Sequence, residues 1–269
     1  MADVVVENKA YFGSKIAAEY DQLNADAIVQ LERGIQERIP FIGVKQGARL
    51  LDYACGTGML SRASTLAQHT SEAIGIDLSH DMVRQYNAQA QTQGSSRQAY
   101  QGNLADPTDA SPAAFADAKF FNFDVAGVGL GFHHFEKPEL ASKRLAERLS
   151  PGGVLFIVDF VAHKIDPEYA AMRGITHHGF LEQQIKTMFE DAGLADFSYQ
   201  EFPDPITFHD YKRRGGHGHN HNHEHDDGKS HGHKQEHDHA HGHGDGHEHM
   251  ENNGGSTTRR VFIARATKL

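Results

Sequence analysis

Residues 50–60 read LLDYACGTGML, and this stretch decides the fold class of the chain. It consists of a short apolar run, a glycine-rich turn and the expected start of an amphipathic helix. An apolar run this short and bounded by glycine is typical of a buried strand. Gly56 and Gly58 lack a Cβ atom, so the backbone can turn sharply and approach a ligand closely. Asp52 ends the strand, at the edge where open α/β sheets bind their ligands.

A second apolar strand, at 73–76, ends in Asp77. Ser79 is a suitable N-cap for the helix that follows. An acidic residue at this place can accept hydrogen bonds from both hydroxyls of a ribose, and Leu78 can pack on an adenine face. The pattern therefore predicts a nucleoside site without choosing the cofactor. A dinucleotide-binding turn, G-x-G-x-x-G, is the alternative, but Ser61 stands where its third glycine would be.

The glycine turn resembles the first motif of class I S-adenosylmethionine-dependent methyltransferases, acidic-x-Gly-x-Gly-x-Gly. The matching positions are Asp52, Ala54, Gly56 and Gly58, with Ala54 in place of the first glycine. In these enzymes the third strand, here 98–101, is usually followed by Gly-Asp-Leu. The chain has Gly102, Asn103 and Leu104 there. Asn103 retains a carbonyl oxygen that can accept a hydrogen bond from the adenine amino group.

The resemblance extends over nearly all of residues 1–210 and resumes at 258–266. A fourth strand within 120–135 contains Asp124 and opens into a glycine-rich exit, a helix is expected over 137–150, and a fifth strand follows Pro151-Gly152-Gly153. Their apolar runs do not alternate with polar residues, as expected for strands covered on both faces. The resemblance implies an α/β fold with a seven-stranded, mostly parallel Rossmann-like sheet. Its last strand is antiparallel, and helices cover both faces.

Three regions are expected along the chain. Residues 1–40 form N-terminal cap helices, 41–214 and 257–269 form the methyltransferase core, and 215–256 form a disordered His-rich insertion. The cap is expected to contain a helical segment within 8–23 and another from about Asn24 to Arg38. The resemblance places Tyr20 near the methionine end of the cofactor. The alternative is that Tyr20 only packs a helix onto the sheet.

The insertion holds thirteen of the 21 histidines, mostly in His-x-His spacing. They are His217, His219, His221, His223, His225, His231, His233, His237, His239, His241, His243, His247 and His249. A segment this polar has nothing to bury and is expected to be disordered, as a loop at the tip of the hairpin formed by the sixth and seventh strands. Imidazoles interspersed with carboxylates can bind Zn, Ni or Cu.

The resemblance implies S-adenosylmethionine as the cofactor, and methyl transfer to a protonated acceptor requires a base near the methyl group. His133 and His134 follow the fourth strand, at the mouth of the expected crevice. A histidine there can take a proton near neutral pH. His178, beside His177, is the next candidate, and His163 is another. The alternative for the His133–His134 pair is a structural role in the loop.

Composition limits the function classes. The net charge is −10 over 269 residues, which argues against nucleic-acid binding. The chain has no run of 18 apolar residues of the kind that would predict a membrane span. We therefore expect a soluble protein of the cytoplasm, with the nucleus left open. Cys55 is the only cysteine and is expected to be a small filler in the glycine turn. We expect a small-molecule acceptor. The competing functions are a non-catalytic methyltransferase-like subunit and a metal-binding protein that uses the His-rich loop.

Overall fold

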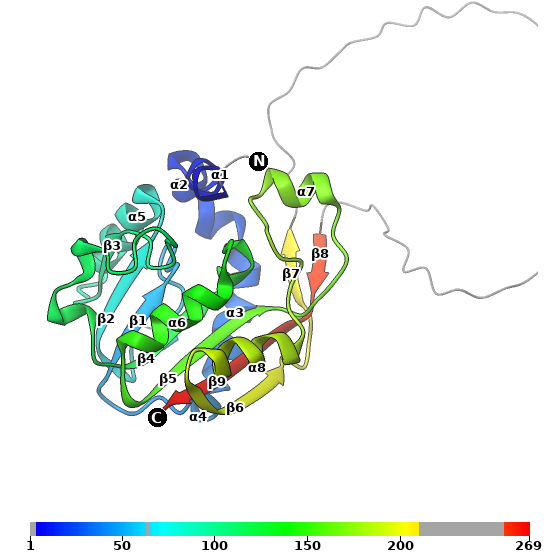
Figure 1. The fold of residues 1–269 in the computed structure, drawn as a ribbon. Helices are drawn as coiled ribbons and strands as arrows, with labels where there is room; N and C mark the ends of the chain where they lie inside the picture. Colours follow the sequence, from blue (N-terminus) through cyan, green and yellow to red (C-terminus); the bar gives the residue numbers. More distant parts are fainter. Residues whose placement is uncertain (1–3, 63–64, 210–255) are drawn as a thin grey trace, which may run out of the picture.

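The computed structural model describes residues 4–62, 65–209 and 256–269, and it contains a seven-stranded sheet (Figure 1). The strands lie in the order β3-β2-β1-β4-β5-β9-β6. Their bounds are β1 Ala48–Tyr53, β2 Thr70–Asp77, β3 Gln98–Gln101, β4 Phe123–Gly129, β5 Leu149–Phe160, β6 Leu194–Glu201 and β9 Val261–Lys268. Neighbouring strands from β3 to β5 are parallel, and β9 is antiparallel to both β5 and β6. The predicted sheet, with its antiparallel last strand, is confirmed.

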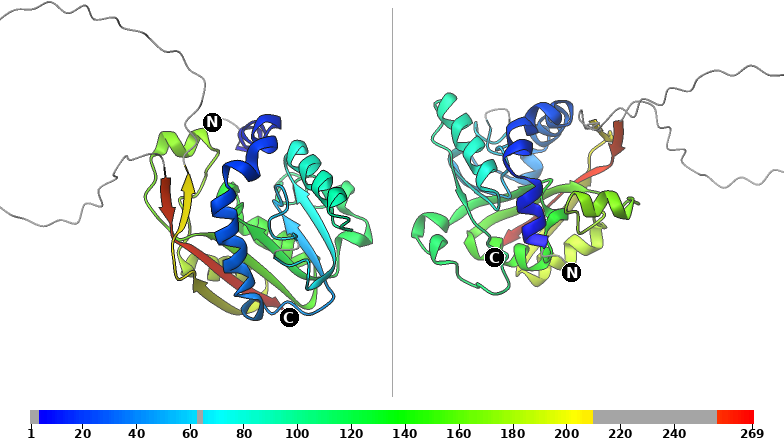
Figure 2. Two further views of the ribbon diagram at one scale, coloured as in Figure 1. Left: turned by 180° about the vertical axis from the view of Figure 1, so that it is seen from behind. Right: turned by 90° about the horizontal axis from the view of Figure 1, so that it is seen from above.

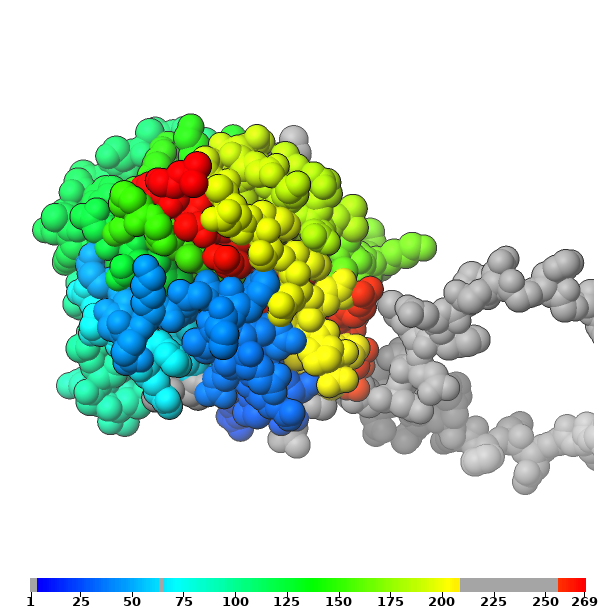
Figure 3. Space-filling view, turned by 90° about the horizontal axis from the view of Figure 1, so that it is seen from below, coloured from blue at the N-terminus to red at the C-terminus, as the bar shows by residue number. Residues whose placement is uncertain are grey.

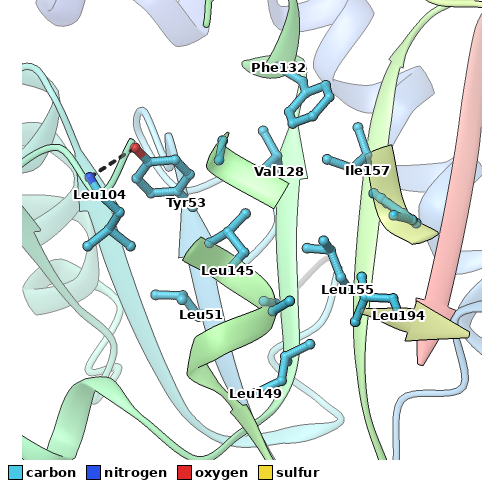
Figure 4. Packing of buried hydrophobic residues seen from close by; sticks show 14 of the residues in the cluster. Leu51, Tyr53, Leu104, Val128, Phe132, Leu145, Leu149, Leu155, Ile157 and Leu194 are labelled. Carbon is cyan, nitrogen blue, oxygen red and sulfur yellow. Dashed lines mark hydrogen bonds between the residues drawn. The ribbon is translucent and has the colours of Figure 1, made fainter. Parts of the chain in front are cut away.

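Successive residues of the central strands bury their side chains on opposite faces of the sheet. Leu155 and Ile157 of β5 belong to one hydrophobic cluster, and Phe156 between them belongs to the other. Leu51 in β1 aligns with Ile74 in β2 and with Ala126 in β4, so one face is continuous across strands. Figure 4 shows part of this cluster. Burial on both faces explains why the strands read as unbroken apolar runs.

Helices cover each face of the sheet. On one face lie α6, Pro138–Arg148, and α8, Glu182–Asp191 (Figure 1). On the other lie α3, Ala25–Gln36, the short α4, Ile39–Ile42, and α5, His80–Thr92 (Figure 2). As predicted, Ser79 caps α5, because its Oγ accepts a hydrogen bond from the Met82 amide at 3.2 Å. None of the helices in the described part of the chain combines the length and the apolar content needed to cross a bilayer.

The N-terminal region differs from the prediction. It contains two short helices, α1 from Val4 to Tyr11 and α2 from Ser14 to Leu23, instead of one helical segment within 8–23. The break falls at Gly13, whose backbone is extended with ψ −174° and which precedes the first turn of α2. Glycine has no side chain to favour helix continuation, so the chain changes direction here. The second predicted helix corresponds to α3.

The prediction of a helix directly after the glycine turn is wrong. Residues 56–62 and 65–69 form consecutive turns instead. The Thr65 hydroxyl contacts the carbonyl oxygens of Met59 and Leu60, both at 2.6 Å, and the Ser61 hydroxyl donates to the Gly58 carbonyl at 3.3 Å. Serine and threonine side chains that bond to nearby backbone groups in this way compete with helix formation.

The remaining described elements lie at the ends of the sheet. They are α7, Pro167–Met172, the single-turn helices η1 Ala113–Phe115, η2 Ala118–Phe120 and η3 Phe132–His134, and the strands β7 Ile206–His209 and β8 Ser256–Arg259. β7 and β8 form an antiparallel ribbon beyond β6 and β9. In the space-filling view of Figure 3, the C-terminal residues (red) lie between green and yellow segments, in agreement with β9 between β5 and β6. The predicted His-rich insertion, 215–256, lies outside the described residues except for Ser256, which begins β8 instead.

Candidate active site

A cavity of about 680 Å³ lies at the carboxyl ends of β1 to β4, on the side where α1 and α2 are seen in Figure 1. The strand ends and the turns that follow them contribute Tyr53, Ala54, Cys55, Gly56, Thr57, Asp77, Leu78, Ser79, Gly102 and Asn103. The N-terminal helices contribute Val4, Val5, Asn8, Tyr20, Ala27, Ile28 and Leu31, with Phe12 between α1 and α2 and Asn24 between α2 and α3. The cavity is therefore formed by the sheet edge on one side and the N-terminal helices on the other.

The glycine turn has a left-handed backbone at three alternate positions. Ala54 has φ 53°, Gly56 φ 52° and Gly58 φ 99°. A Cβ at Gly56 would have no heavy atom within 4 Å, so this glycine borders open space in the cavity. A Cβ at Gly58 would lie 2.9 Å from the Tyr86 ring. Gly56 thus leaves room for a ligand, whereas Gly58 leaves room for a packed aromatic side chain.

Asp77 lies at the end of β2 and is held by two backbone amides. Its Oδ2 accepts a hydrogen bond from Gly56 N at 2.8 Å, and its Oδ1 accepts one from Ser79 N at 2.8 Å. Burial raises the pKa of this carboxyl, while the hydrogen bonds from Ser79 and Gly56 act in the opposite direction. Asp77 and the adjacent Leu78 both line the cavity. The carboxylate that the sequence placed at a ribose therefore meets the glycine turn at the cavity wall.

Asn103 also lines the cavity, but its carbonyl oxygen already has partners. Oδ1 accepts hydrogen bonds from the Tyr53 hydroxyl at 3.1 Å and from Ala105 N at 2.9 Å. A carbonyl oxygen has two lone pairs, so a ligand at Asn103 meets its Nδ2 donors. A hydrogen bond from an adenine amino group to this oxygen, as expected from the sequence, would compete with the bonds from Tyr53 and Ala105. Leu104 is fully buried in the core, and its amide donates to the Tyr53 hydroxyl at 3.1 Å (Figure 4).

Asp52 lies behind the cavity wall and does not line it, nor do Gly58 and Leu104. It is 1% exposed, and its Oδ2 has no hydrogen-bond partner among the described residues. Burial raises the pKa of Asp52 to about 8, and the nearby Ser61 hydroxyl acts in the opposite direction. The neutral form of this carboxyl therefore predominates at pH 7, and the group supports the turn from behind.

Asp21 ties α2 to the wall of the cavity. Its carboxylate accepts hydrogen bonds from the Thr57 hydroxyl at 2.6 Å, from Arg62 Nη2 at 2.8 Å and from Gln89 Nε2 at 2.8 Å. The preceding Tyr20 lines the cavity, and burial raises its pKa to about 12. Tyr20 is therefore a neutral phenol in the wall of the cavity.

His134 lines the cavity, and His133 lies beneath it, with ring centroids 4.2 Å apart. Nδ1 of His134 is 3.0 Å from the Gly174 carbonyl oxygen, which can only accept, so Nδ1 carries the proton and Nε2 is the acceptor. Burial and the neighbouring His133 lower the pKa of His134 well below its usual range. His134 is thus neutral at pH 7 and able to accept a proton.

Asp159, near the end of β5, holds His133. Its Oδ1 is 2.7 Å from Nδ1 of the His133 ring, and its Oδ2 accepts a hydrogen bond from the His133 amide at 3.1 Å. Asp159 is fully buried. The carboxylate fixes η3, and with it the position of His134. An acidic residue in the apolar run VLFIVDF was a signal for this role that sequence reasoning did not use.

The other candidate histidines lie away from the cavity wall. His178 is exposed, and its carbonyl oxygen accepts a hydrogen bond from His163 N at 2.9 Å. His163 and His177 are half-buried, and burial lowers the pKa of each. None of the three lines the cavity. Of the histidines proposed from sequence as bases, only His134 lines it.

Asn8 of α1 is a cavity residue that sequence reasoning missed. Its Nδ2 donates a hydrogen bond to the His134 carbonyl at 3.1 Å and so links the first helix to the loop after β4. No motif marks it in the sequence. In the described part of the chain, no three His, Cys, Asp or Glu side chains are grouped as metal ligands. The thirteen histidines proposed as ligands lie outside the described residues.

Comparison with known proteins identifies the family. The methyltransferase-domain family matches residues 26–199. An uncharacterized methyltransferase of Schizosaccharomyces pombe is 30% identical over 162 residues, which are 56% of this chain and 55% of that protein. The chain thus spans about half of the length of that relative. A ubiquinone/menaquinone biosynthesis C-methyltransferase of Erwinia tasmaniensis is 27% identical over 72% of this chain and 73% of its own.

The fold is also found among solved structures. Phosphoethanolamine N-methyltransferase 2 of Haemonchus contortus, in complex with S-adenosyl-L-methionine, superposes with a TM-score of 0.58 at 17% identity. The match covers 75% of this chain and 46% of that one. The family match agrees with three features of the structure: the strand order, the glycine turn and the acidic residue at the end of β2. The chain belongs to the class I S-adenosylmethionine-dependent methyltransferases.

Proposed function

We propose that the protein transfers the methyl group of S-adenosylmethionine to a small-molecule acceptor in the described cavity. The observation that carries the proposal is the open space at Gly56, bordered by the Asp77 carboxylate. A cavity of about 680 Å³ lies in the size range of sites for cofactors and small molecules, roughly 300–1,000 Å³. The names of the relatives, which include a C-methyltransferase of quinone biosynthesis, support a small-molecule acceptor.

The residues of the cavity fit the parts of the donor. Asp77 is placed to accept from ribose hydroxyls, and the apolar side chains of Leu78 and Met82 can pack on the adenine. Asn103 offers amide donors at the same end, and Tyr20 lines the same cavity as the glycine turn. Bound S-adenosylmethionine supplies a methyl group on a sulfonium, which is a good leaving group. The protein then has to hold the acceptor in line and remove a proton where one must leave.

His134 is the base in this proposal. Its Nδ1–H donates to the Gly174 carbonyl, which leaves the Nε2 lone pair for the acceptor's proton. His133 and Asp159 act through His134, because they pack beneath its ring and fix the loop that carries it. His178 serves as a comparison, since it is exposed and does not line the cavity.

Transfer of a labelled methyl group tests this function. S-adenosylmethionine with a tritiated methyl is incubated with the protein and a metabolite extract, and labelled products are separated by chromatography. We expect a labelled product that His134→Ala reduces about 10²-fold or more, while His178→Ala leaves its rate within twofold. Transfer that depends on His178 and not on His134 would contradict the assignment of the base. No transfer from a protein that binds the donor would favour the non-catalytic alternative.

A further inference from the structure

The cavity has two chemically different halves. The half at the ends of β1 to β3 contains the glycine turn, Asp77 and Asn103. The other half lies between α1, α3, the strand β7 and the first part of the loop after β4, from Leu130 to His134. Its apolar lining residues are Val4, Val5, Ala27, Ile28, Leu31, Leu130 and Phe208. Its polar residues are Asn8 and His134, and Asn24 lies between α2 and α3.

This second half, which we call the acceptor half, has no charged side chain among its described lining residues. Four charged residues line the rest of the cavity. Asp77 ends β2 and Asp106 follows β3. Glu136 and Lys137 are exposed and directly follow Phe135, whose ring packs on Tyr53 of β1 at 5.3 Å.

An ionised acceptor would be unfavourable in such surroundings. Moving a charged group out of water without a partner of opposite charge is strongly unfavourable, whereas apolar surface gains free energy from burial. Ile28 is 7% exposed and Leu31 is 1% exposed, so this wall of the cavity is aliphatic and closely packed. A carboxylate, phosphate or ammonium group would meet aliphatic side chains and two asparagine amides there, with no side chain of opposite charge among the lining residues of this half.

We propose that the acceptor is an uncharged, largely apolar molecule with one acidic hydroxyl group, a phenol or an enol, which points to His134. This proposal rests on the proposed function and specifies the substrate class of the same site. The hydroxyl proton passes to Nε2 of His134, and the acceptor oxygen forms a bond to the methyl carbon. The carbon–sulfur bond breaks and leaves its electron pair on sulfur, which becomes a neutral thioether. The imidazolium then releases its proton to water.

Two contacts hold His134 for this step. The Gly174 carbonyl accepts from Nδ1, so the ring is fixed with Nε2 as the acceptor. The Phe12 ring packs edge-on against the imidazole with centroids 5.2 Å apart. The base is thus set in an apolar frame at the junction of the two halves, where a neutral ring can lie against α3 while its hydroxyl reaches the imidazole.

Three probes with the same ring and different charges test the acceptor class. Equilibrium dialysis in the presence of saturating S-adenosylhomocysteine measures the affinities of 1-naphthol, 1-naphthoate and 1-naphthylmethylammonium. We expect 1-naphthol to bind at least tenfold more tightly than either ion. Equal or tighter binding of one of the ions, or no binding of 1-naphthol at millimolar concentration, overturns the proposal.

A matched pair of variants on α3 locates the site. Ile28→Glu places a carboxylate in the acceptor half and should lower the ratio of naphthol to ammonium affinity at least tenfold. Val29→Glu adds the same charge at a side chain that is 65% exposed and should keep the ratio within twofold. An unchanged ratio in a folded Ile28→Glu protein contradicts the proposed location. If that variant does not fold, the ranking of the probes on the unaltered protein decides.

Failure of this proposal can be distinguished from failure of the proposed function. If S-adenosylhomocysteine does not bind, the methyltransferase activity is refuted, and the probe ranking without it still tests the acceptor half. If it binds and the probes show no preference for 1-naphthol, only the acceptor class is wrong.

Discussion

Replacing Gly56 by alanine separates the cost to folding from the cost to binding. Gly56 has φ 52°, and a Cβ there has no heavy atom within 4 Å, so the added methyl group causes no clash within the protein. The remaining cost is the left-handed backbone, about 1–2 kcal/mol for a residue with a Cβ. For a domain of this size, each kcal/mol lowers the melting temperature by roughly 2–4 °C. The methyl group also occupies space in the cavity, so the affinity for S-adenosylhomocysteine should fall at least tenfold, about 1.4 kcal/mol.

Gly43→Ala is the matched control for this variant. Gly43 has φ 81° and also has open space around its Cβ position, but it lies at the end of α4 and does not line the cavity. Differential scanning calorimetry should give similar losses of melting temperature for both variants, and titration calorimetry should show weaker binding only for Gly56→Ala. The reasoning is refuted if Gly56→Ala binds S-adenosylhomocysteine as tightly as Gly43→Ala does.

Three further changes have defined outcomes. Asp52→Asn should become more stabilising, relative to the unaltered protein, as the pH rises from 5 to 8. Burial raises the folded-state pKa of Asp52 to about 8, above its ordinary value of 3.8, so the unaltered protein loses stability over this range. If the difference in melting temperature between Asp52→Asn and the unaltered protein does not change with pH, the raised pKa is contradicted. Turnover should stay constant with pH above 6.5 and fall only at more acidic pH, because burial lowers the pKa of His134; a rate that declines below pH 7.5 would assign the base elsewhere. Deleting residues 217–249 and joining Gly216 to Met250 should abolish retention on a nickel column, because thirteen histidines are removed. The melting temperature should stay within about 2 °C, which corresponds to about 0.5–1 kcal/mol for a domain of this size, since Ala240 is the only aliphatic residue in the deleted stretch. A larger loss would show that the stretch supports the core.

The sheet could be predicted from sequence because its signals are local. Each central strand is a short apolar run that ends at a turn, and Asp77 and Ser79 mark the end of β2 and the start of α5. The helix after the glycine turn was predicted wrongly because its pattern also fits consecutive turns. Hydrogen bonds from Ser61 and Thr65 to backbone carbonyls decide between the two, and their geometry is not visible in the sequence.

The site could be predicted only in part. Glycine and acidic residues at strand ends follow a motif, which places Gly56 and Asp77 at the cavity. Neither the contact of Asn8 with the loop after β4 nor that of Asp159 with His133 follows a motif, since each joins residues far apart in the chain. The role of the apolar face of α3 as a wall of the cavity could not be predicted either. A helix with one buried face is expected in any α/β fold, so the pattern does not indicate a binding site.

Binding of the demethylated cofactor tests the central claim most directly. Titration calorimetry should give a micromolar dissociation constant for S-adenosylhomocysteine, which corresponds to a binding free energy of about −8 kcal/mol. It should show no binding of NADH. Asp77→Ala should weaken binding at least tenfold. Asp109→Ala removes an exposed carboxylate that does not line the cavity and should leave the affinity within twofold. Binding of NADH in place of S-adenosylhomocysteine, or an affinity unaffected by Asp77→Ala, would contradict the account.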